Sequence, residues 1–191
     1  MVLNDEHTYK LDVITDETTP PTEGTTDLVQ EFRIVRPTTL QRINLAGPGD
    51  FRVEWNSAVN GKTYELWAHV HYLETPRGNV ADSTMKKATW RIKSDIESRD
   101  IDGGEEMGYD IAYPNFFTAM LAVIPVDENV DRYLRAITFY VSSGTEEMAL
   151  YRQVYQPSGG IVQERPPYTN LNNGIGLFTS RHTESRYSEK I

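Results

Sequence analysis

Residues 51–73 contain two runs in which apolar and polar side chains alternate, and these runs constrain the fold more than any other feature. In the first run Phe51, Val53 and Trp55 share one face. In the second run the apolar face carries Tyr64, Leu66, Ala68, Val70 and Tyr72. A period of two residues is typical of a half-buried β-strand. Asn60-Gly61 lies between the runs and is the dipeptide most typical of a tight hairpin turn, since both residues tolerate positive φ. The pattern predicts a β-hairpin over residues 50–74.

Similar alternation predicts further strands. They are expected at residues 8–15, 28–37, 39–47, 86–94 and 131–143. Within 86–94, Ala88, Trp90 and Ile92 are expected to face the core. The segment 15–27 is rich in Thr, Pro and acidic residues, which favours an exposed loop.

The asparagine- and glycine-rich segment near the end of the chain allows two interpretations. Gly174 and Gly176 flank an isoleucine, but a phosphate-binding loop needs a third glycine and a following helix, and no lysine follows here. The three asparagines upstream are typical of a turn. We therefore expect a turn leading into a closing strand at Ile175–Thr179.

Two segments have helical rather than alternating spacing. Residues 112–124 carry apolar side chains between Pro114, suited to a first helical turn, and Pro125, suited to a stop. Residues 145–156 begin with Thr145, a candidate N-cap, followed by two acidic residues that complement the helix dipole. Both helices are therefore predicted in the second half of the chain.

Many strands followed by two helices predict a mainly β protein. The expected fold is an antiparallel immunoglobulin- or fibronectin-like sandwich with two packed helices, in a single domain over residues 1–191. A subdivision into a hairpin-rich half, 1–95, and a helix-containing half, 96–191, follows from the order of these elements.

The charge and composition exclude several function classes. The 28 acidic residues outnumber the 19 Lys and Arg, which gives a net charge of −9, and no basic cluster is visible, so no nucleic-acid partner is expected. The absence of cysteine excludes thiolate metal sites, a catalytic cysteine and disulfides. The longest nearly apolar run, Phe116–Val126, is too short to span a bilayer and contains Pro125, so no membrane span is predicted.

His69 and His71 lie two residues apart on a predicted strand, so both rings should project from one face, together with Glu65. This spacing allows metal binding, but no third or fourth ligand is evident. We therefore predict no tight metal site and no cofactor. The acidic segment 95–106 leaves calcium binding open, although it lacks the ligand order of an EF-hand loop.

Trp67 lies on the same polar face as the two histidines. With Trp55, Trp90 and the tyrosines it suggests an aromatic platform for a sugar or a peptide, while aromatic packing within the sandwich is the alternative. The candidate ligand-binding residues are Trp67, His69 and His71. No nucleophile elbow, zinc-protease helix or defined carboxylate pair is present, so no catalytic residue is assigned.

Three segments resemble exported lipoproteins of the Bacteroidetes type, a family of unknown function. The segments are FRVEWNSAVNGKTYELWAHVHYLE, VDRYLRAITFYVSSGTEEMALYRQVYQP and RPPYTNLNNGIGLFTSR. The family is similar in its Y-x-L-x-V strand, here Tyr9–Val13, and in its closing N-x-x-x-G-x-G-x-F element, here Asn170–Phe178. The resemblance implies a sandwich domain in the cell envelope, in the periplasm or on the outer-membrane surface. The motifs carry no catalytic residues.

The chain departs from this family pattern in lacking a lipobox cysteine and an export signal. A lipid anchor lost with the N-terminus would explain the difference, and a cytoplasmic location stays open. The first function hypothesis is a non-enzymatic cell-envelope protein that binds a glycan, a peptide or another protein through one face of the sandwich. The alternative is a metal-assisted hydrolase or another enzyme centred on His69 and His71.

Overall fold

The structure is a computed structural model that describes residues 3–16, 18–44, 50–155 and 167–189. The strands are β1 (Thr8–Val13), β2 (Thr22–Asp27), β3 (Ile34–Arg36), β4 (Asp50–Asn56), β5 (Thr63–Pro76), β6 (Thr84–Glu97), β7 (Glu106–Ala112), β8 (Val130–Gly144) and β9 (Arg181–Ser188). The helices are α1 (Tyr113–Val123), α2 (Glu146–Tyr155) and the short 3-10 helix η1 (Val80–Asp82).

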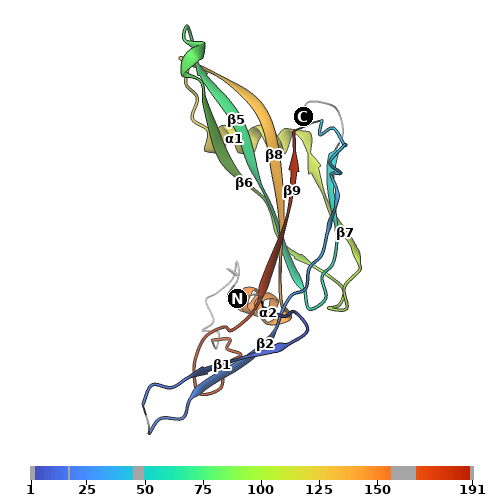
Figure 1. Ribbon diagram of the computed structural model, residues 1–191, viewed down its shortest axis with the longest axis vertical. Coiled ribbons are helices and arrows are strands. Elements are labelled where there is room, and N and C mark those ends of the chain that lie inside the picture. Colours follow the sequence, from blue (N-terminus) through green and yellow to red (C-terminus); the bar gives the residue numbers. More distant parts are fainter. Residues whose placement is uncertain (1–2, 17, 45–49, 156–166, 190–191) are drawn as a thin grey trace, which may run out of the picture.

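In the part of the chain that the structure describes, all the strand pairs are antiparallel, and the strands form three sheets (Figure 1). β1 and β2 form a two-stranded sheet, the order β3-β4-β7 forms a second, and the order β6-β5-β8-β9 forms a third. The prediction of a mainly β protein with antiparallel sheets and two α-helices is confirmed. Strands from either side of residue 95 share both larger sheets, since β4 pairs with β7 and β5 pairs with β8.

The core lies between the three-stranded and the four-stranded sheet. Phe51 of β4 stacks on Phe139 of β8 with ring centroids 5.6 Å apart, and Trp55 contacts Tyr64 at 6.1 Å. Trp55 is only 1% exposed. The inward residues of β5 follow the predicted alternation, because Tyr64, Leu66, Ala68 and Val70 are buried, while Tyr72 is partly buried.

The predicted hairpin over residues 50–74 is wrong in its pairing. Both strands form where the alternation predicts them, but β4 pairs with β3 and β7, whereas β5 pairs with β6 and β8. Asn60 does adopt a positive φ of 63°. The turn crosses between the two sheets, and it packs into the core, because the Ala58 N–H donates to Tyr64 Oη at 2.8 Å. A Cβ at Gly61 would lie 2.6 Å from the same Oη, so the crossing needs glycine there.

The segment predicted as a loop over 15–27 contains a strand instead. β2 pairs with β1 from Thr22↔Val13 to Asp27↔Thr8, and the prolines fall in the turn before it. Three of the six residues of β2 are threonine, whose branched side chain favours a pleated strand. The strands predicted at 28–37 and 39–47 reduce to the three residues of β3, and positions 45–47 lie outside the described residues.

Both predicted helices are confirmed, at Tyr113–Val123 and Glu146–Tyr155. α1 packs against β6 and β7, with the Phe116 ring 5.4 Å from that of Trp90. α2 lies near the opposite end of the molecule, beside the β1–β2 hairpin (Figure 1). The hydroxyl of Thr145, the predicted N-cap, shares a 2.6 Å hydrogen bond with that of Thr179. No helix in the described part of the chain is long and apolar enough to cross a membrane.

The predicted closing strand Ile175–Thr179 is also wrong. The Ile175 side chain is 77% exposed, and the last strand is β9, further along the chain. Residues 169–178 form a loop closed by the Asn170 side chain, which donates to Phe178 O at 2.6 Å and accepts from Phe178 N at 2.9 Å. Such side-chain bonds to the backbone compete with a strand ladder. The loop joins β2 through paired backbone bonds between Glu23 and Asn172.

Candidate functional site

The three candidate residues Trp67, His69 and His71 lie on the outer face of the four-stranded sheet, the face turned away from the core. They alternate along β5 with buried neighbours such as Ala68, and each is half-buried. The structure therefore brings together the residues that the two-residue period places on one face.

An aromatic cluster builds the centre of this outer face. Trp67 and Tyr140 are register partners on β5 and β8, and their rings stack 4.0 Å apart at an angle of 6°. The His69 ring meets both edge-on, at 5.0 Å from Trp67 and 5.1 Å from Tyr140. His71 is held by a 3.1 Å hydrogen bond between its Nε2 and Thr138 Oγ1. The Tyr140 ring thus covers one face of the indole.

The predicted aromatic platform does not include the other two tryptophans. Trp55 and Trp90 are buried between the sheets, on the inner faces of β4 and β6. The stacking on Tyr140 also leaves only one face of the Trp67 indole available for a ligand. The aromatic surface that a ligand can reach is therefore a single indole wall rather than a broad platform.

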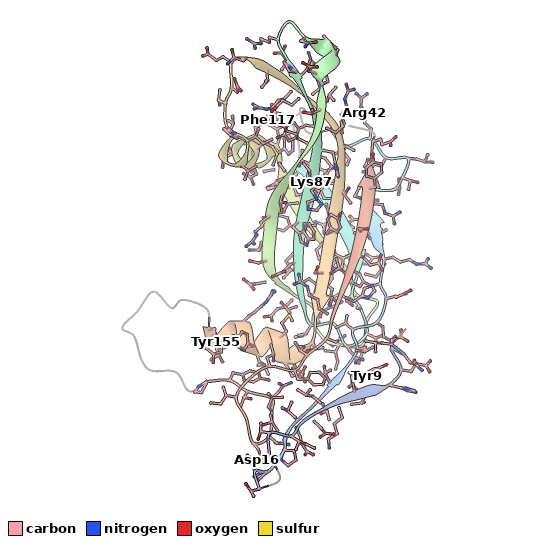
Figure 2. The ribbon with its side chains drawn as sticks, turned by 60° about the vertical axis from the view of Figure 1, so that its left-hand side comes forward. Tyr9, Asp16, Arg42, Lys87, Phe117 and Tyr155 are labelled. Atoms are coloured by element: carbon pink, nitrogen blue, oxygen red, sulfur yellow. The ribbon has the colours of Figure 1, made fainter. Side chains whose placement is uncertain are left out.

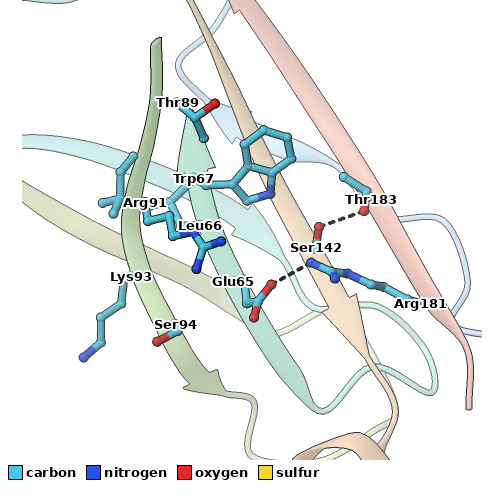
Figure 3. A pocket seen from close by; sticks show the side chains of 11 residues that line it. Glu65, Leu66, Trp67, Thr89, Arg91, Lys93, Ser94, Ser142, Arg181 and Thr183 are labelled. Carbon is cyan, nitrogen blue, oxygen red and sulfur yellow. Dashed lines mark hydrogen bonds and ion pairs between the residues drawn. The ribbon is translucent and has the colours of Figure 1, made fainter. Parts of the chain in front are cut away.

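A groove of about 770 Å³ lies on this outer face, and Trp67 is one of its walls (Figure 3). Its lining comes from all four strands of the sheet. Arg91 and Lys93 belong to β6, and Arg181 and Thr183 belong to β9. These four residues were not among the sequence candidates. Arg91 and Lys93 could have been found from the outward phase of the predicted strand 86–94, but the strand that carries Arg181 was predicted at the wrong place.

Among the residues that the structure describes, Glu65 is the only carboxylate that lines this groove, and two arginines neutralise it. Arg181 Nη2 donates to Glu65 Oε2 at 2.6 Å. Arg152 of α2 donates to Glu65 Oε1 and also lies 3.6 Å from Asp95. These ion pairs fasten α2 and the start of β9 to the sheet at one end of the groove.

The opposite side of the groove carries cations without such partners. Arg91 and Lys93 line it, and Lys87 lies on the same outer side of β6 outside the lining. All three are exposed, and none of them forms an ion pair with the residues that the structure describes. The groove is therefore locally positive in a chain whose net charge is −9. This local reversal of sign favours an anionic ligand.

His69 is held in its neutral form by its surroundings. Burial lowers the pKa of His69 below its ordinary value of 6.5, and the nearby charges of Lys87 and His71 lower it further. A neutral imidazole can donate one hydrogen bond and accept one. At pH 7 the side chain therefore contributes hydrogen bonding, not charge, to the outer face.

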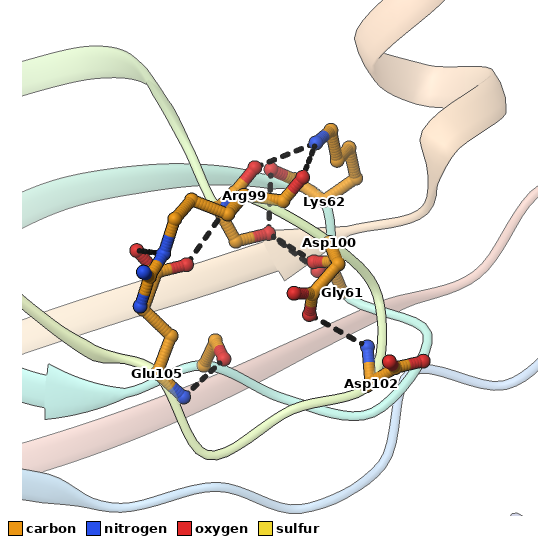
Figure 4. Close-up of polar contacts among 8 residues, drawn as sticks. Gly61, Lys62, Arg99, Asp100, Asp102 and Glu105 are labelled. Carbon is orange, nitrogen blue, oxygen red and sulfur yellow. Dashed lines mark hydrogen bonds and ion pairs between the residues drawn. The ribbon is translucent and has the colours of Figure 1, made fainter.

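Among residues 3–16, 18–44, 50–155 and 167–189 there is no group of three His, Asp or Glu side chains placed to hold a metal ion. The His69 and His71 rings lie 6.3 Å apart at 88°. In the acidic segment 95–106 the Glu105 and Asp100 carboxylates have separate local partners (Figure 4). Glu105 pairs with Arg99 at 2.9 Å, and Asp100 Oδ1 accepts from Asp102 N at 3.1 Å.

Comparisons of this chain with protein-family models, with curated proteins and with solved structures find no match.

Proposed function

We propose that the protein is a non-enzymatic binding protein and that the outer face of its four-stranded sheet binds an acidic glycan, a sugar chain carrying carboxylate or sulfate groups. The observation that carries this proposal is the groove itself. It combines one accessible indole face, from Trp67, with two exposed cations that no described carboxylate neutralises, Arg91 and Lys93. An aromatic wall packs against the apolar side of a sugar ring, while guanidinium and ammonium groups bind its acidic substituents.

The position of the groove favours a glycan over a peptide strand. Peptides that join a sheet use the unpaired backbone groups of an edge strand. β5 runs beneath the groove and is paired on both sides, with β6 and with β8, so its backbone is occupied. Recognition there depends on side chains. Thr89, Ser142 and Thr183 add hydroxyl groups to the lining, which suit the many hydroxyls of a sugar.

We also propose that the two larger sheets are a variant of the immunoglobulin/fibronectin-like sandwich. The order β3-β4-β7 corresponds to strands A-B-E, and β5-β8-β9 corresponds to C-F-G. The remaining strand, β6, joins the C-F-G sheet rather than the A-B-E sheet. The connection after E carries α1, and the connection after F carries α2. Backbone NOEs that place β6 beside β7 instead of β5 would contradict this assignment.

Membership of the exported lipoprotein family and a location in the cell envelope remain proposals that rest on the three segments quoted above. Fractionation of the source cells, with an antibody against the chain, tests the location. Recovery of the protein only in the cytoplasmic fraction would contradict it.

The enzyme hypothesis centred on His69 and His71 remains the alternative. Among the residues that the structure describes, no third His, Asp or Glu joins these two in a group placed to hold a metal ion, and His71 is hydrogen-bonded to Thr138. Elemental analysis of protein purified without added metal tests it. A full equivalent of zinc that is lost in the His69→Ala/His71→Ala double variant would favour the enzyme hypothesis over the binding protein.

The glycan proposal is tested by calorimetric titration with oligogalacturonate, with a neutral glucan oligomer of equal length and with a polyglutamate peptide. The wild type should bind the oligogalacturonate and not the neutral oligomer. Trp67→Ala and Arg91→Gln should each weaken binding about tenfold, which corresponds to about 1.4 kcal/mol. Arg42→Gln is the matched control, because Arg42 is also exposed but does not line the groove.

Two results would overturn the proposal. One is equal affinity of the wild type, Trp67→Ala and Arg91→Gln for the acidic oligomer, which would place binding elsewhere. The other is binding of polyglutamate alone with the same dependence on Trp67, which would assign the face to an acidic peptide.

A further inference from the structure

Helix α1 contains no charged residue. Its sequence, YPNFFTAMLAV, has no Asp, Glu, Lys or Arg over Tyr113–Val123. Phe116 and Met120 form its buried side and pack towards the core, where Phe116 meets Trp90. A helix on the surface of a soluble protein normally presents charged and polar residues on its other side. α1 does not, so its exposed side needs a separate explanation.

An apolar stripe runs along the exposed side of α1. It consists of Tyr113, Phe117 and Leu121, which are 38%, 44% and 68% exposed and lie four residues apart. Residues at this spacing stand one above the other on a helix. Val123 and Val126 are also exposed and extend the apolar area beyond the stripe. A contiguous apolar patch of this kind marks an interaction surface.

The charges around the stripe discriminate between partners. Asp127 and Glu128 follow the helix closely and are exposed. Lys86 and Arg132 lie beside them, so the charge near this end of the stripe is mixed and does not favour an anionic membrane surface. The interior of the stripe carries no charge of either sign, so it offers nothing to an ionic ligand and differs in chemistry from the groove beside Trp67.

A second copy of the chain fits the stripe. In a two-fold contact each residue near the axis faces its own counterpart, so any charge there would meet a like charge. α1 has none. The stripe is also symmetric about its middle residue, with one large apolar side chain four residues before Phe117 and one four residues after it. When two such helices cross antiparallel, Phe117 meets Phe117, and Tyr113 of each copy lies opposite Leu121 of the other.

We propose that the protein forms a two-fold dimer through the stripe Tyr113, Phe117 and Leu121, with α1 of the two copies antiparallel. This contact is independent of glycan binding. Phe117 lies far from Asp16 at the hairpin tip (Figure 2), whereas Glu65, at one end of the groove, is tied to α2 on the hairpin side (Figure 1). If the dimer proposal fails, the glycan proposal is therefore unaffected, and the reverse is also true.

The register of the contact is tested by disulfide trapping, which is unambiguous here because the chain has no cysteine. Phe117→Cys alone should give a cross-linked dimer under mild oxidation. Tyr113→Cys and Leu121→Cys should cross-link when mixed, and far less when each is alone. Asn115→Cys is the control, since Asn115 is exposed on another side of the same helix and should stay uncross-linked.

Sedimentation velocity of the unmodified chain tests the contact without any new thiol. The wild type and Asn115→Glu should sediment as dimers, while Leu121→Glu should be a folded monomer by circular dichroism. A monomeric wild type would overturn the proposal, and so would a Phe117→Cys variant that cross-links no more than the control. A monomer that co-sediments with phosphatidylcholine vesicles through the same stripe would instead assign α1 to a lipid surface.

Discussion

At the scale of single residues, Trp55 and Trp67 contribute to different properties of the molecule. Trp55 is 1% exposed between the sheets, while Trp67 is half-buried on the outer face, as the phase of the alternation predicts. Trp55→Ala should therefore lower the free energy of unfolding by about 3–5 kcal/mol, as removal of a buried aromatic ring does. Trp67→Ala should cost less stability. Urea unfolding of both variants measures this, and a larger loss for Trp67→Ala would invert the assignment of faces.

The protonation of His69 gives a second prediction at this scale. Its pKa in the folded protein is lowered, first by burial and then by Lys87 and His71, so the fold favours the neutral ring. The stabilising effect is present above the unfolded value of about 6.5 and is lost as pH falls through the lower folded value. A titration followed by NMR should give a midpoint below 6.5, and Lys87→Ala should raise it. A midpoint at or above 6.5 would contradict this environment.

At the scale of elements, the loop between β6 and β7 depends on contact with the crossing between β4 and β5. Gly103 and Gly104 have nearly the same positive φ, 81° and 79°. A Cβ at Gly103 would lie 2.9 Å from the Val59 backbone nitrogen, while one at Gly104 would meet nothing within 4 Å. Both alanine variants carry the cost of positive φ, about 1–2 kcal/mol.

Gly103→Ala should therefore lower the free energy of unfolding by about 1–3 kcal/mol more than Gly104→Ala does. Only the new Cβ at position 103 would overpack its surroundings. Thermal or denaturant unfolding of the two variants gives the difference directly. Equal losses would mean that the loop and the crossing are not in contact as described.

The last strand gives a further prediction at this scale. β9 pairs with β8 from Ser188↔Ile137 to Arg181↔Gly144 and supplies Arg181 to Glu65. Deletion of residues 181–191 should lower both the midpoint and the slope of denaturant unfolding, because it strips a strand and exposes a new sheet edge. An unchanged midpoint and slope would show that β9 adds little to the sheet.

Sequence patterns predicted the positions of the strands better than they predicted which strands pair with each other. β4, β5, β6 and β8 each have one apolar face, so their period of two is visible in the sequence. β9 was missed because its inner side is polar as well. There Arg186 donates to the backbone oxygen of Ile34 and His182 packs on Phe32. An Asn-Gly turn permits positive φ whether the next strand returns in the same sheet or crosses to the other. The dipeptide therefore does not identify which strands pair.

For the candidate site, the residues that share a face of one strand were predictable, but the residues contributed by neighbouring strands were not. The shared face of Trp67, His69 and His71 follows from local alternation. Tyr140 and Arg181 could not be added, because the positions of Tyr140 beside Trp67 and of Arg181 beside Glu65 depend on the pairing of β5 with β8 and of β8 with β9. Contacts between strands distant in sequence are not encoded in the period of either strand.

At the scale of the whole molecule, positive charge is concentrated on one surface of a chain that is negative overall. The chain carries −9 overall, yet the exposed outer side of β6 carries Lys87, Arg91 and Lys93. Long-range attraction of an acidic ligand is therefore weak, and binding depends on short-range contacts within the groove. The apolar stripe on α1, the groove and the β1–β2 hairpin occupy different parts of an elongated molecule (Figure 1).

Mapping of amide and indole chemical shifts during titration with oligogalacturonate tests the central claim most directly, because it reports the binding surface without any mutation. The account predicts the largest changes at the Trp67 indole N–H and in β5 and β6 around Arg91, with α1 and the β1–β2 hairpin unchanged. Saturable changes confined to another surface, or no change at concentrations well above those used in calorimetry, would contradict the assignment of the outer face as the glycan-binding site.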